Sequence, residues 1–481
     1  MIATLKGASK DWLKRALREA FGPRLDQKTQ IPPEHWGLSR DQRGRLTLDQ
    51  LALQELSGRF GSPLHVVNAQ RLRDNARRFM HVPAGAQRGC EVFYSYKTNP
   101  VPGVLAELHA LGVGAEVISP YELWLALRLG VPPGQIVYNG PAKSPESIRQ
   151  AIELDIQLLN LNHREEIAVV AGIAAQLKKR ARVGVRVTLS GWAAQFGTPV
   201  AAGQALATFA EALKHDSLQV VALHVHRGGM IHGADELREF VQQVLAFADA
   251  LRDRFGLSLE VLDFGGSLGS ASVRSLSGRE LRMNRTLFKE LSAPEPARAL
   301  GIEAYVALLL ESVHRHYLEL GQPTPRVFVE PGRALTSDAQ LLLTQVLGLK
   351  DTPDQTYAIL DAGINLADSC RSEYHQFMLA NRDAPARSRP YTLVGPICTP
   401  GDTLRWAVRL PELAAGDTLA IMDSGAYFVP FATSFSFPQP GLVLVDEQGA
   451  RPMRRAETFD DLVSYDEASC FPRGATLVPP T

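Results

Sequence analysis

The sequence predicts an α/β protein: a (β/α)8 barrel, a second, mainly β domain on the C-terminal side and a short helical extension on the N-terminal side. Two observations support this fold. Short β-branched or apolar runs alternate with helix-length amphipathic segments between about residues 91 and 330, and closely spaced strands and turns follow from about residue 341. Strands that alternate with helices are typical of parallel β-α-β units. The length of 481 residues also favours more than one domain.

Eight candidate strands lie before residue 330, and eight such units over about 240 residues are typical of a closed barrel. We expect these strands at 91–96, 115–118, 136–138, 156–159, 182–187, 220–226, 259–263 and 327–329. An open, doubly wound sheet is the alternative topology. The expected boundaries are 1–46 for the helical extension and linker, 47–335 for the barrel and 336–481 for the β domain.

Three segments outside the strands carry their own signals. Residues 9–21 place their apolar side chains on one face of a helix, and a second helix is expected from about 47 to 60. Residues 270–301 form a long, charged insertion between the last two barrel strands. Such an insertion could be a lid, but we interpret it as a disordered loop.

The composition favours a protein that acts on a small molecule. Its 51 basic and 51 acidic residues balance, which removes the electrostatic argument for a nucleic-acid or membrane partner. No apolar run is long enough to span a membrane. The four cysteines are scattered without metal-binding spacing, so we expect no metal site and a reducing compartment. With no secretory signal in view, a cytoplasmic location is expected.

Unusual polar residues follow several of the predicted strands, and the carboxyl ends of barrel strands are where active sites lie. Lys97 follows the first strand. A lysine in an apolar barrel mouth loses hydration, which lowers its pKa and leaves neutral amine for attack on an aldehyde. A single lysine is more often structural, so its neighbours decide between the two interpretations.

Those neighbours suit a cofactor that has an aldehyde, a phosphate and a pyridine ring. The Gly-Gly-Ser-Leu-Gly run at 265–269 follows Asp263, and Glu330 and Arg333 follow the eighth strand. Glycines let backbone N–H groups approach an anion, although tight turns use them as well. Together with Lys97, they predict pyridoxal phosphate held as a Schiff base, with an acid to keep the ring nitrogen protonated.

Nine motifs in order make the sequence resemble the fold-type III decarboxylases, which include the diaminopimelate, ornithine and arginine decarboxylases. The resemblance covers about residues 47–440 and is strongest to the diaminopimelate decarboxylase-like members. The motifs are Tyr-Lys-Thr-Asn-Pro at 96–100, Glu-Val-Ile-Ser-Pro-Tyr-Glu-Leu at 116–123, Asn-Gly-Pro-Ala-Lys-Ser at 139–144, His-Arg-Gly-Gly at 226–229, Asp-Phe-Gly-Gly at 263–266, Glu-Pro-Gly-Arg at 330–333, Asp-Ala-Gly at 361–363, Cys-Thr-Pro-Gly-Asp at 398–402 and Gly-Ala-Tyr at 425–427.

The resemblance implies a role for each matching residue. Lys97 would hold the cofactor, His226 would stack on its ring and Glu330 would pair with its ring nitrogen. Arg186, Asp263 and Gly229 would also lie at the cofactor; Gly229 stands where the family usually has a serine on the phosphate. The remaining phosphate contacts implied by the resemblance are Gly265, Gly266, Gly332, Arg333 and Tyr427.

The resemblance also implies how the reaction ends and how the protein assembles. Cys398 would return a proton to the α-carbon, although a cysteine is often only a small buried residue. Arg333, Asp402 and Tyr427 would contact the amino-acid substrate. In the family, the residues that match Cys398 and Asp402 come from the partner subunit, so a homodimer with shared active sites is expected.

The sequence departs from the diaminopimelate decarboxylases where they bind the substrate. Thr399 stands in place of their usual glutamate, and the segment 361–375 lacks their Arg-Pro-x-Leu-Tyr run, for which Arg371 and Tyr374 are possible substitutes. Lost polar contacts change specificity more than chemistry. We therefore expect decarboxylation of diaminopimelate or of a modified diamino acid. An amino-acid racemase and a catalytically silent cofactor-binding homologue are the alternatives.

Overall fold

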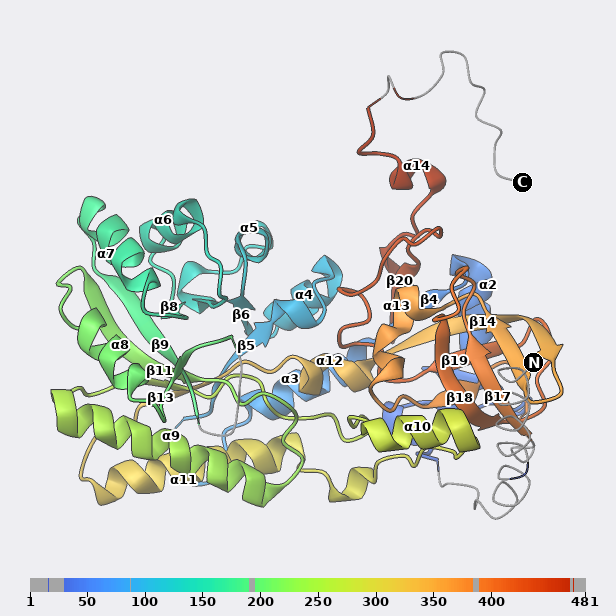
Figure 1. Ribbon diagram of the computed structural model, residues 1–481, viewed down its shortest axis with the longest axis horizontal. Coiled ribbons are helices and arrows are strands. Elements are labelled where there is room, and N and C mark those ends of the chain that lie inside the picture. Colours follow the sequence, from blue (N-terminus) through green and yellow to red (C-terminus); the bar gives the residue numbers. More distant parts are fainter. Residues whose placement is uncertain are drawn as a thin grey trace, which may run out of the picture.

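The computed structural model describes residues 30–86, 88–189, 195–383 and 389–467, together with Ala16 and Cys470. The helix expected at 9–21 lies outside these residues apart from Ala16. The described chain forms two units side by side, a barrel wrapped in helices and a β domain (Figure 1). None of its helices combines the length and the apolar character needed to cross a membrane.

The barrel consists of eight parallel strands that close into a ring. Their order is β5-β6-β7-β8-β9-β11-β12-β13, and β13 pairs with β5 to complete the circle. Their bounds are β5 Glu91–Ser95, β6 Gly114–Val117, β7 Ile136–Tyr138, β8 Leu158–Leu161, β9 Ala181–Thr188, β11 Leu218–Val225, β12 Val261–Asp263 and β13 Arg326–Val329. Each of the eight expected strands is present, so the predicted barrel is confirmed and the open sheet is excluded.

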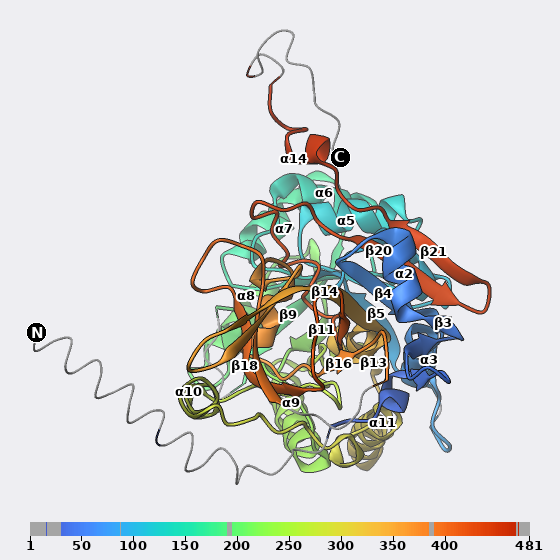
Figure 2. The same cartoon turned by 90° about the vertical axis from the view of Figure 1, so that its right-hand side faces the viewer.

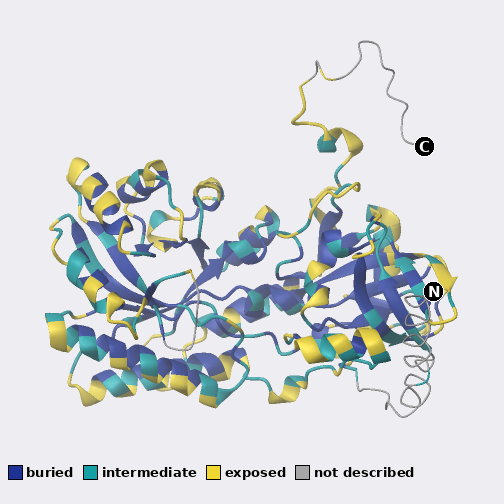
Figure 3. Ribbon diagram, viewed as in Figure 1, coloured by how far each residue is buried: buried dark blue, intermediate teal, exposed yellow. Residues whose placement is uncertain are grey.

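Helices surround the ring, and their apolar faces meet the outside of the strands (Figure 3). Several begin at a predictable cap: Ser119 accepts a hydrogen bond from the backbone N–H of Glu122, and Ser144 from that of Ser147. The helices are α3 Ala69–Met80, α4 Pro102–His109, α5 Pro120–Arg128, α6 Pro145–Glu153, α7 Glu166–Gln176, α8 Gln204–Ala212, α9 Ala234–Phe255 and α11 Ile302–Glu319.

The second domain is a mainly β unit, as expected. Its long sheet has the order β18-β17-β15-β14-β4-β20-β21, and β19 pairs with both β14 and β16. The bounds are β4 Leu64–Asn68, β14 Gln340–Asp351, β15 Thr356–Leu360, β16 Phe377–Leu379, β17 Arg389–Val394, β18 Thr403–Leu410, β19 Thr418–Ile421, β20 Gly441–Asp446 and β21 Gly449–Arg454. Figure 2 views this domain from its outer side.

The start of the chain contributes to the second domain, which differs from the expected boundary at residue 47. Strand β4 lies between β14 and β20, antiparallel to the first and parallel to the second, and all five of its residues are buried. Ahead of it, a small sheet forms from β1 Ser39–Arg40, β2 Leu46–Leu48 and β3 Leu51–Ala52. The helix expected from 47 is therefore shorter and runs over α2 Leu53–Phe60.

The 270–301 insertion contains regular structure, so its interpretation as a disordered loop was wrong. It contains helix α10 Gly278–Leu287, which starts at a capping box of Ser277 and Glu280. The Asn284 amide donates 2.8 Å to the carbonyl oxygen of Trp406 in β18. The insertion thus links the barrel sequence to the β domain, as seen where α10 lies beneath β18 in Figure 1.

Candidate active site

The carboxyl ends of the barrel strands bring the expected residues together around one cavity. Lys97 follows β5, His226 follows β11 and Glu330 follows β13, while Arg186 lies near the end of β9. These four line a cavity of about 370 Å³ together with Glu116, Ile118, Asn139, Gly140, Pro141, Thr188, Phe196 and Gly228. Parallel strands all deliver their ends to the same rim, which explains how distant residues meet.

The Lys97 ammonium group is held by two polar partners. It donates 2.7 Å to Oε2 of Glu116 and 2.6 Å to the hydroxyl of Ser95. Burial lowers the pKa of Lys97, but the carboxylates of Glu116 and Glu330 outweigh that effect and the net pKa is raised. The expectation of a lowered pKa was wrong because it allowed for lost hydration and not for the carboxylates that share the cavity.

A buried amide network joins the acids of the cavity. The side-chain nitrogen of Asn139 donates 2.9 Å to Glu116 and 2.7 Å to Glu330, and Asn160 in turn donates 2.7 Å to the Asn139 oxygen. Sequence reasoning gave no role to Glu116, Asn139 or Asn160. Glu116 and Asn139 stood in the quoted motifs at predicted strand ends, which was the signal available for them.

Glu330 lies in a buried cluster with Asp263 and His224. Burial and the neighbouring Asp263 and Glu116 carboxylates raise the pKa of Glu330 well above its ordinary value, and burial raises the pKa of Asp263 to about 6. His224 Nε2 lies 3.5 Å from Glu330 and makes no hydrogen bond. Such a cluster needs a positive partner, and a protonated ring nitrogen supplies one.

The ligand atoms of this cluster lie within 4.8 Å of one another, a spacing compatible with a metal ion. A pyridinium fits better, because Lys97 and the amide network on the same wall suit an aldehyde-bearing ring. The pairing of Glu330 with that ring nitrogen stays a prediction.

The glycines at 265 and 266 hold His226 in place. The backbone N–H of Gly266 donates 3.2 Å to Nδ1 of His226, and the backbone N–H of Gly265 donates 3.0 Å to Asp263. A Cβ at Gly266 would lie 1.8 Å from the Glu330 carbonyl oxygen, so no other residue fits there. Burial lowers the pKa of His226 to about 3, which keeps its imidazole neutral. A neutral ring suits stacking on a cofactor face.

The predicted phosphate residues lie on the same side of the barrel. Gly229 has a φ of 82°, a left-handed backbone conformation that favours glycine. A Cβ on Gly332 would come within 2.0 Å of the Thr98 hydroxyl, next in the chain to Lys97. The backbone N–H of Tyr427 donates 2.9 Å to the Thr98 carbonyl, which brings the β domain to the rim. Their contacts with a phosphate stay predictions.

Two arginines at the site have different surroundings. Arg186 is part of the cavity wall and stacks over Phe196, with its guanidinium carbon 4.9 Å from the ring centroid. Arg333 is engaged by an acid from the β domain, since its guanidinium group forms two hydrogen bonds with the Glu373 carboxylate. Sequence reasoning missed Glu373.

Cys398 and Asp402 lie in the β domain and are absent from the described residues that line the Lys97 cavity. Cys398 is exposed. The Asp402 carboxylate is buried and accepts hydrogen bonds from the backbone N–H groups of Ile364 at 2.8 Å and Ile397 at 2.9 Å. Cys398 is therefore accessible to another molecule, while Asp402 holds together two loops of its own domain.

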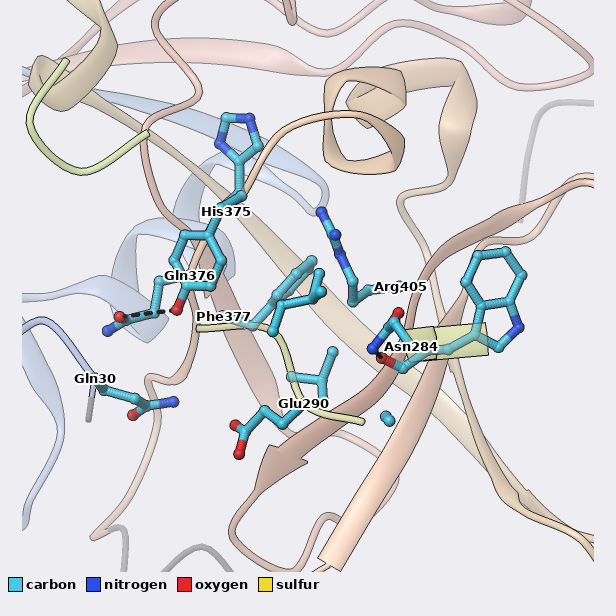
Figure 4. Close-up of a pocket in the computed structure, with 12 residues that line it drawn as sticks. Gln30, Asn284, Glu290, His375, Gln376, Phe377 and Arg405 are labelled. Atoms are coloured by element: carbon cyan, nitrogen blue, oxygen red, sulfur yellow. Dashed lines mark hydrogen bonds between the residues drawn. The ribbon is translucent and has the colours of Figure 1, made fainter. Parts of the chain in front are cut away.

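A separate pocket lies between α10 and the β domain (Figure 4). Its volume of about 30 Å³ is the space of a single water. Arg405 and His375 lie on one side of it and Glu290 on the other. It is too small for a substrate. The Lys97 cavity is the candidate active site because Lys97, Arg186, His226 and Glu330 all line it.

The Lys97 cavity passes the tests that a pyridoxal phosphate site must meet. It offers an amine to bind the aldehyde and buried acids that need a cation. The fold and the site together define an enzyme that uses pyridoxal phosphate on a (β/α)8 barrel.

Comparison with known proteins supplies the family. Residues 71–337 match the family model described as "Pyridoxal-dependent decarboxylase, pyridoxal binding domain". The chain belongs to this family and is a pyridoxal-phosphate-dependent amino-acid decarboxylase. It is 30% identical over 442 residues to the diaminopimelate decarboxylase of Pseudomonas aeruginosa, covering 89% of this chain and 98% of that protein.

Other relatives agree in sequence and structure. The diaminopimelate decarboxylase of Aquifex aeolicus is 28% identical over 436 residues, which cover 87% of this chain and 95% of that protein. The crystal structure of the M. jannaschii diaminopimelate decarboxylase has a TM-score of 0.78 at 25% identity and covers 89% of this chain and 97% of its own. Both domains of the chain are therefore typical of the family.

Proposed function

We propose that this enzyme decarboxylates a diamino acid, diaminopimelate or a modified relative of it, on pyridoxal phosphate attached to Lys97. One observation carries the proposal: Lys97 and Glu330 face one cavity, and Asn139 joins Glu330 to Glu116, the acid that holds the lysine. The names of the relatives support the substrate class, since those most similar are diaminopimelate decarboxylases.

The residues of the chain divide the work of the reaction. When bound, pyridoxal phosphate supplies an electron sink for the pair left behind as carbon dioxide departs. Glu330 keeps the ring nitrogen protonated, and its raised pKa falls when that cation arrives beside it. His226 would stack on the bound ring as a neutral imidazole, and Glu116 holds the Lys97 amine on the cavity wall.

The proposal includes a homodimer in which Cys398 of one subunit returns the proton at the active site of the other. Its support is that Cys398 is exposed in the described chain and does not line that chain's own cavity. Asp402 would act at the same shared site by holding the loop that carries Cys398. We also propose a cytoplasmic location, on the balanced charge and scattered cysteines.

The test is to purify the protein with its cofactor and measure carbon dioxide release from a panel of L- and D-amino acids. Borohydride treatment followed by peptide mapping is expected to place the cofactor on Lys97. Racemisation without carbon dioxide release would favour the racemase alternative, and a protein that takes up no cofactor would refute the proposal.

A further inference from the structure

Arg333 is already paired with a carboxylate from its own chain. Its Nη1 and Nη2 donate 2.9 Å and 2.8 Å to the two oxygens of Glu373, and the two side chains are only 12% and 16% exposed. This is the two-pronged geometry in which guanidinium binds a carboxylate best. A fork occupied in this way has little capacity for a second carboxylate.

The pair is connected to Lys97 through Tyr427. The Arg333 guanidinium carbon is 5.2 Å from the ring centroid of Tyr427, and Tyr427 is among the groups that raise the Lys97 pKa. The backbone N–H of Tyr427 donates 2.9 Å to the carbonyl oxygen of Thr98, which is next in the chain to Lys97. Thr98 and Tyr427 thus link the cofactor lysine to the Arg333–Glu373 pair.

Glu373 is held in position from both sides of its backbone. Its carbonyl oxygen accepts a hydrogen bond from the guanidinium group of the buried Arg405. The backbone N–H of the next residue, Tyr374, donates 2.9 Å to the carbonyl oxygen of Arg274. His375 Nε2 also lies 3.6 Å from the Glu373 carboxylate. His375 and Arg405 stand on the same side of the pocket in Figure 4. The acid is thus a built part of the site.

We propose that Glu373 takes the place of a substrate carboxylate at Arg333, so that the enzyme selects amino acids with a single carboxyl group, the one that is lost. The inference rests on the proposed function and narrows it. A side chain ending in a second carboxylate would meet the Glu373 charge and find Arg333 already neutralised. Like-charge contact of this kind rejects a substrate more effectively than a missing contact does.

Lysine and diaminopimelate provide a matched pair of probes, because they differ only by the carboxyl group at the far carbon. We expect the cofactor-loaded, full-length enzyme to favour lysine by about tenfold or more in kcat/KM, each probe being tested in all its configurations. Calorimetric binding of lysine and of diaminopimelate to the borohydride-reduced enzyme, which turns neither of them over, is expected to favour lysine by a similar factor.

Glu373→Gln removes the carboxylate charge and frees Arg333. It is therefore expected to lower the ratio of kcat/KM for lysine to that for diaminopimelate by about tenfold. Glu91→Gln is the matched control, since Glu91 forms a similar pair with Arg326, from Nε at 2.6 Å, at the opposite end of the barrel strands. The control is expected to leave the lysine-to-diaminopimelate ratio unchanged.

The outcomes separate this inference from the proposed function. If the unmodified enzyme prefers diaminopimelate to lysine, the role of Glu373 is overturned while the proposed decarboxylase function stands. This comparison does not depend on the folding of any variant. If no amino acid releases carbon dioxide, the proposed function fails, and tighter binding of diaminopimelate than of lysine then overturns the role of Glu373 independently.

Discussion

The Lys97 ammonium nitrogen lies 2.7 Å from Oε2 of Glu116. Glu116 is buried, and its other oxygen accepts the Asn139 amide. The carboxylate keeps its charge because the Lys97 ammonium lowers its pKa against the effect of burial. The pair places the reactive amine at a fixed point of the cavity and keeps it protonated until the cofactor replaces the ion pair.

Replacing Glu116 with glutamine is expected to make Lys97 more reactive in the cofactor-free protein. The Glu116 carboxylate raises the Lys97 pKa above its ordinary value, so its loss lowers that pKa and increases the neutral amine at a given pH. The pH dependence of the rate of cofactor uptake should therefore move to lower pH.

Glu91→Gln at the far end of β5 serves as the control for this change, since it removes a carboxylate that does not face Lys97. A pH profile of cofactor uptake that is identical in Glu116→Gln and the unmodified protein would contradict the assigned pairing.

Glu330→Gln is expected to stabilise the cofactor-free protein at neutral pH while reducing its activity. The folded protein holds the Glu330 pKa well above its ordinary value, because the carboxylate is buried beside Asp263. Between about pH 4.3, where the unfolded chain releases this proton, and the folded pKa, the folded state binds more protons. Its stability therefore falls as pH rises through that window.

The measurement is thermal unfolding of the unmodified and Glu330→Gln proteins, both without cofactor, at about pH 5 and pH 8. The unmodified protein should lose more stability over this range than Glu330→Gln does. Equal losses of stability in the two proteins would show that burial and the neighbouring carboxylates do not raise the Glu330 pKa.

The barrel and the Lys97 rim were predictable because they depend on local patterns. The alternation of strands and helices located β5 to β13, and Lys97, His226 and Glu330 each stood at a strand end. Strand β4 was not predictable, since its partners β14 and β20 lie more than 250 residues further along the chain. Nothing in its local sequence specifies such a distant pairing.

The pKa of Lys97 and the pairing of Arg333 were missed for a related reason. Both depend on which acids approach in space: Glu116 from the neighbouring strand β6 and Glu373 from the other domain. Burial can be estimated from one segment, but a charge partner from another domain cannot. Helix α10 is different, because its Ser277 and Glu280 capping box was readable in the sequence and was given too little weight.

Cys398→Ala is expected to slow product formation by about a hundredfold while the cofactor stays bound, as measured by carbon dioxide release and by visible absorbance. The proposed shared site adds a sharper test. Mixed dimers of Cys398→Ala and Lys97→Ala subunits contain one active site with both residues intact, so mixing two inactive variants should restore part of the activity. No recovery in dimers shown to have exchanged would contradict the shared site.

Asp402→Asn is expected to destabilise the β domain, because this carboxylate accepts backbone hydrogen bonds from Ile364 and Ile397 and is 4% exposed. Cβ atoms on Gly363 and Gly395 would lie 2.4 Å and 2.5 Å from its oxygens, so both loops are shaped around it. An asparagine can accept through only one of its two terminal atoms, which should cost about 1–3 kcal/mol in denaturant unfolding.

Thr399→Ala provides the matched control, since Thr399 is half-buried in the same loop and its hydroxyl accepts a long hydrogen bond, 3.4 Å from the backbone N–H of Gly401. If Asp402 served only to contact substrate, Asp402→Asn would raise KM and leave the unfolding midpoint unchanged. We expect Asp402→Asn instead to lower the denaturant midpoint of unfolding. We also expect kcat to fall, because the change displaces Cys398, which is four residues away and on the same loop as Ile397.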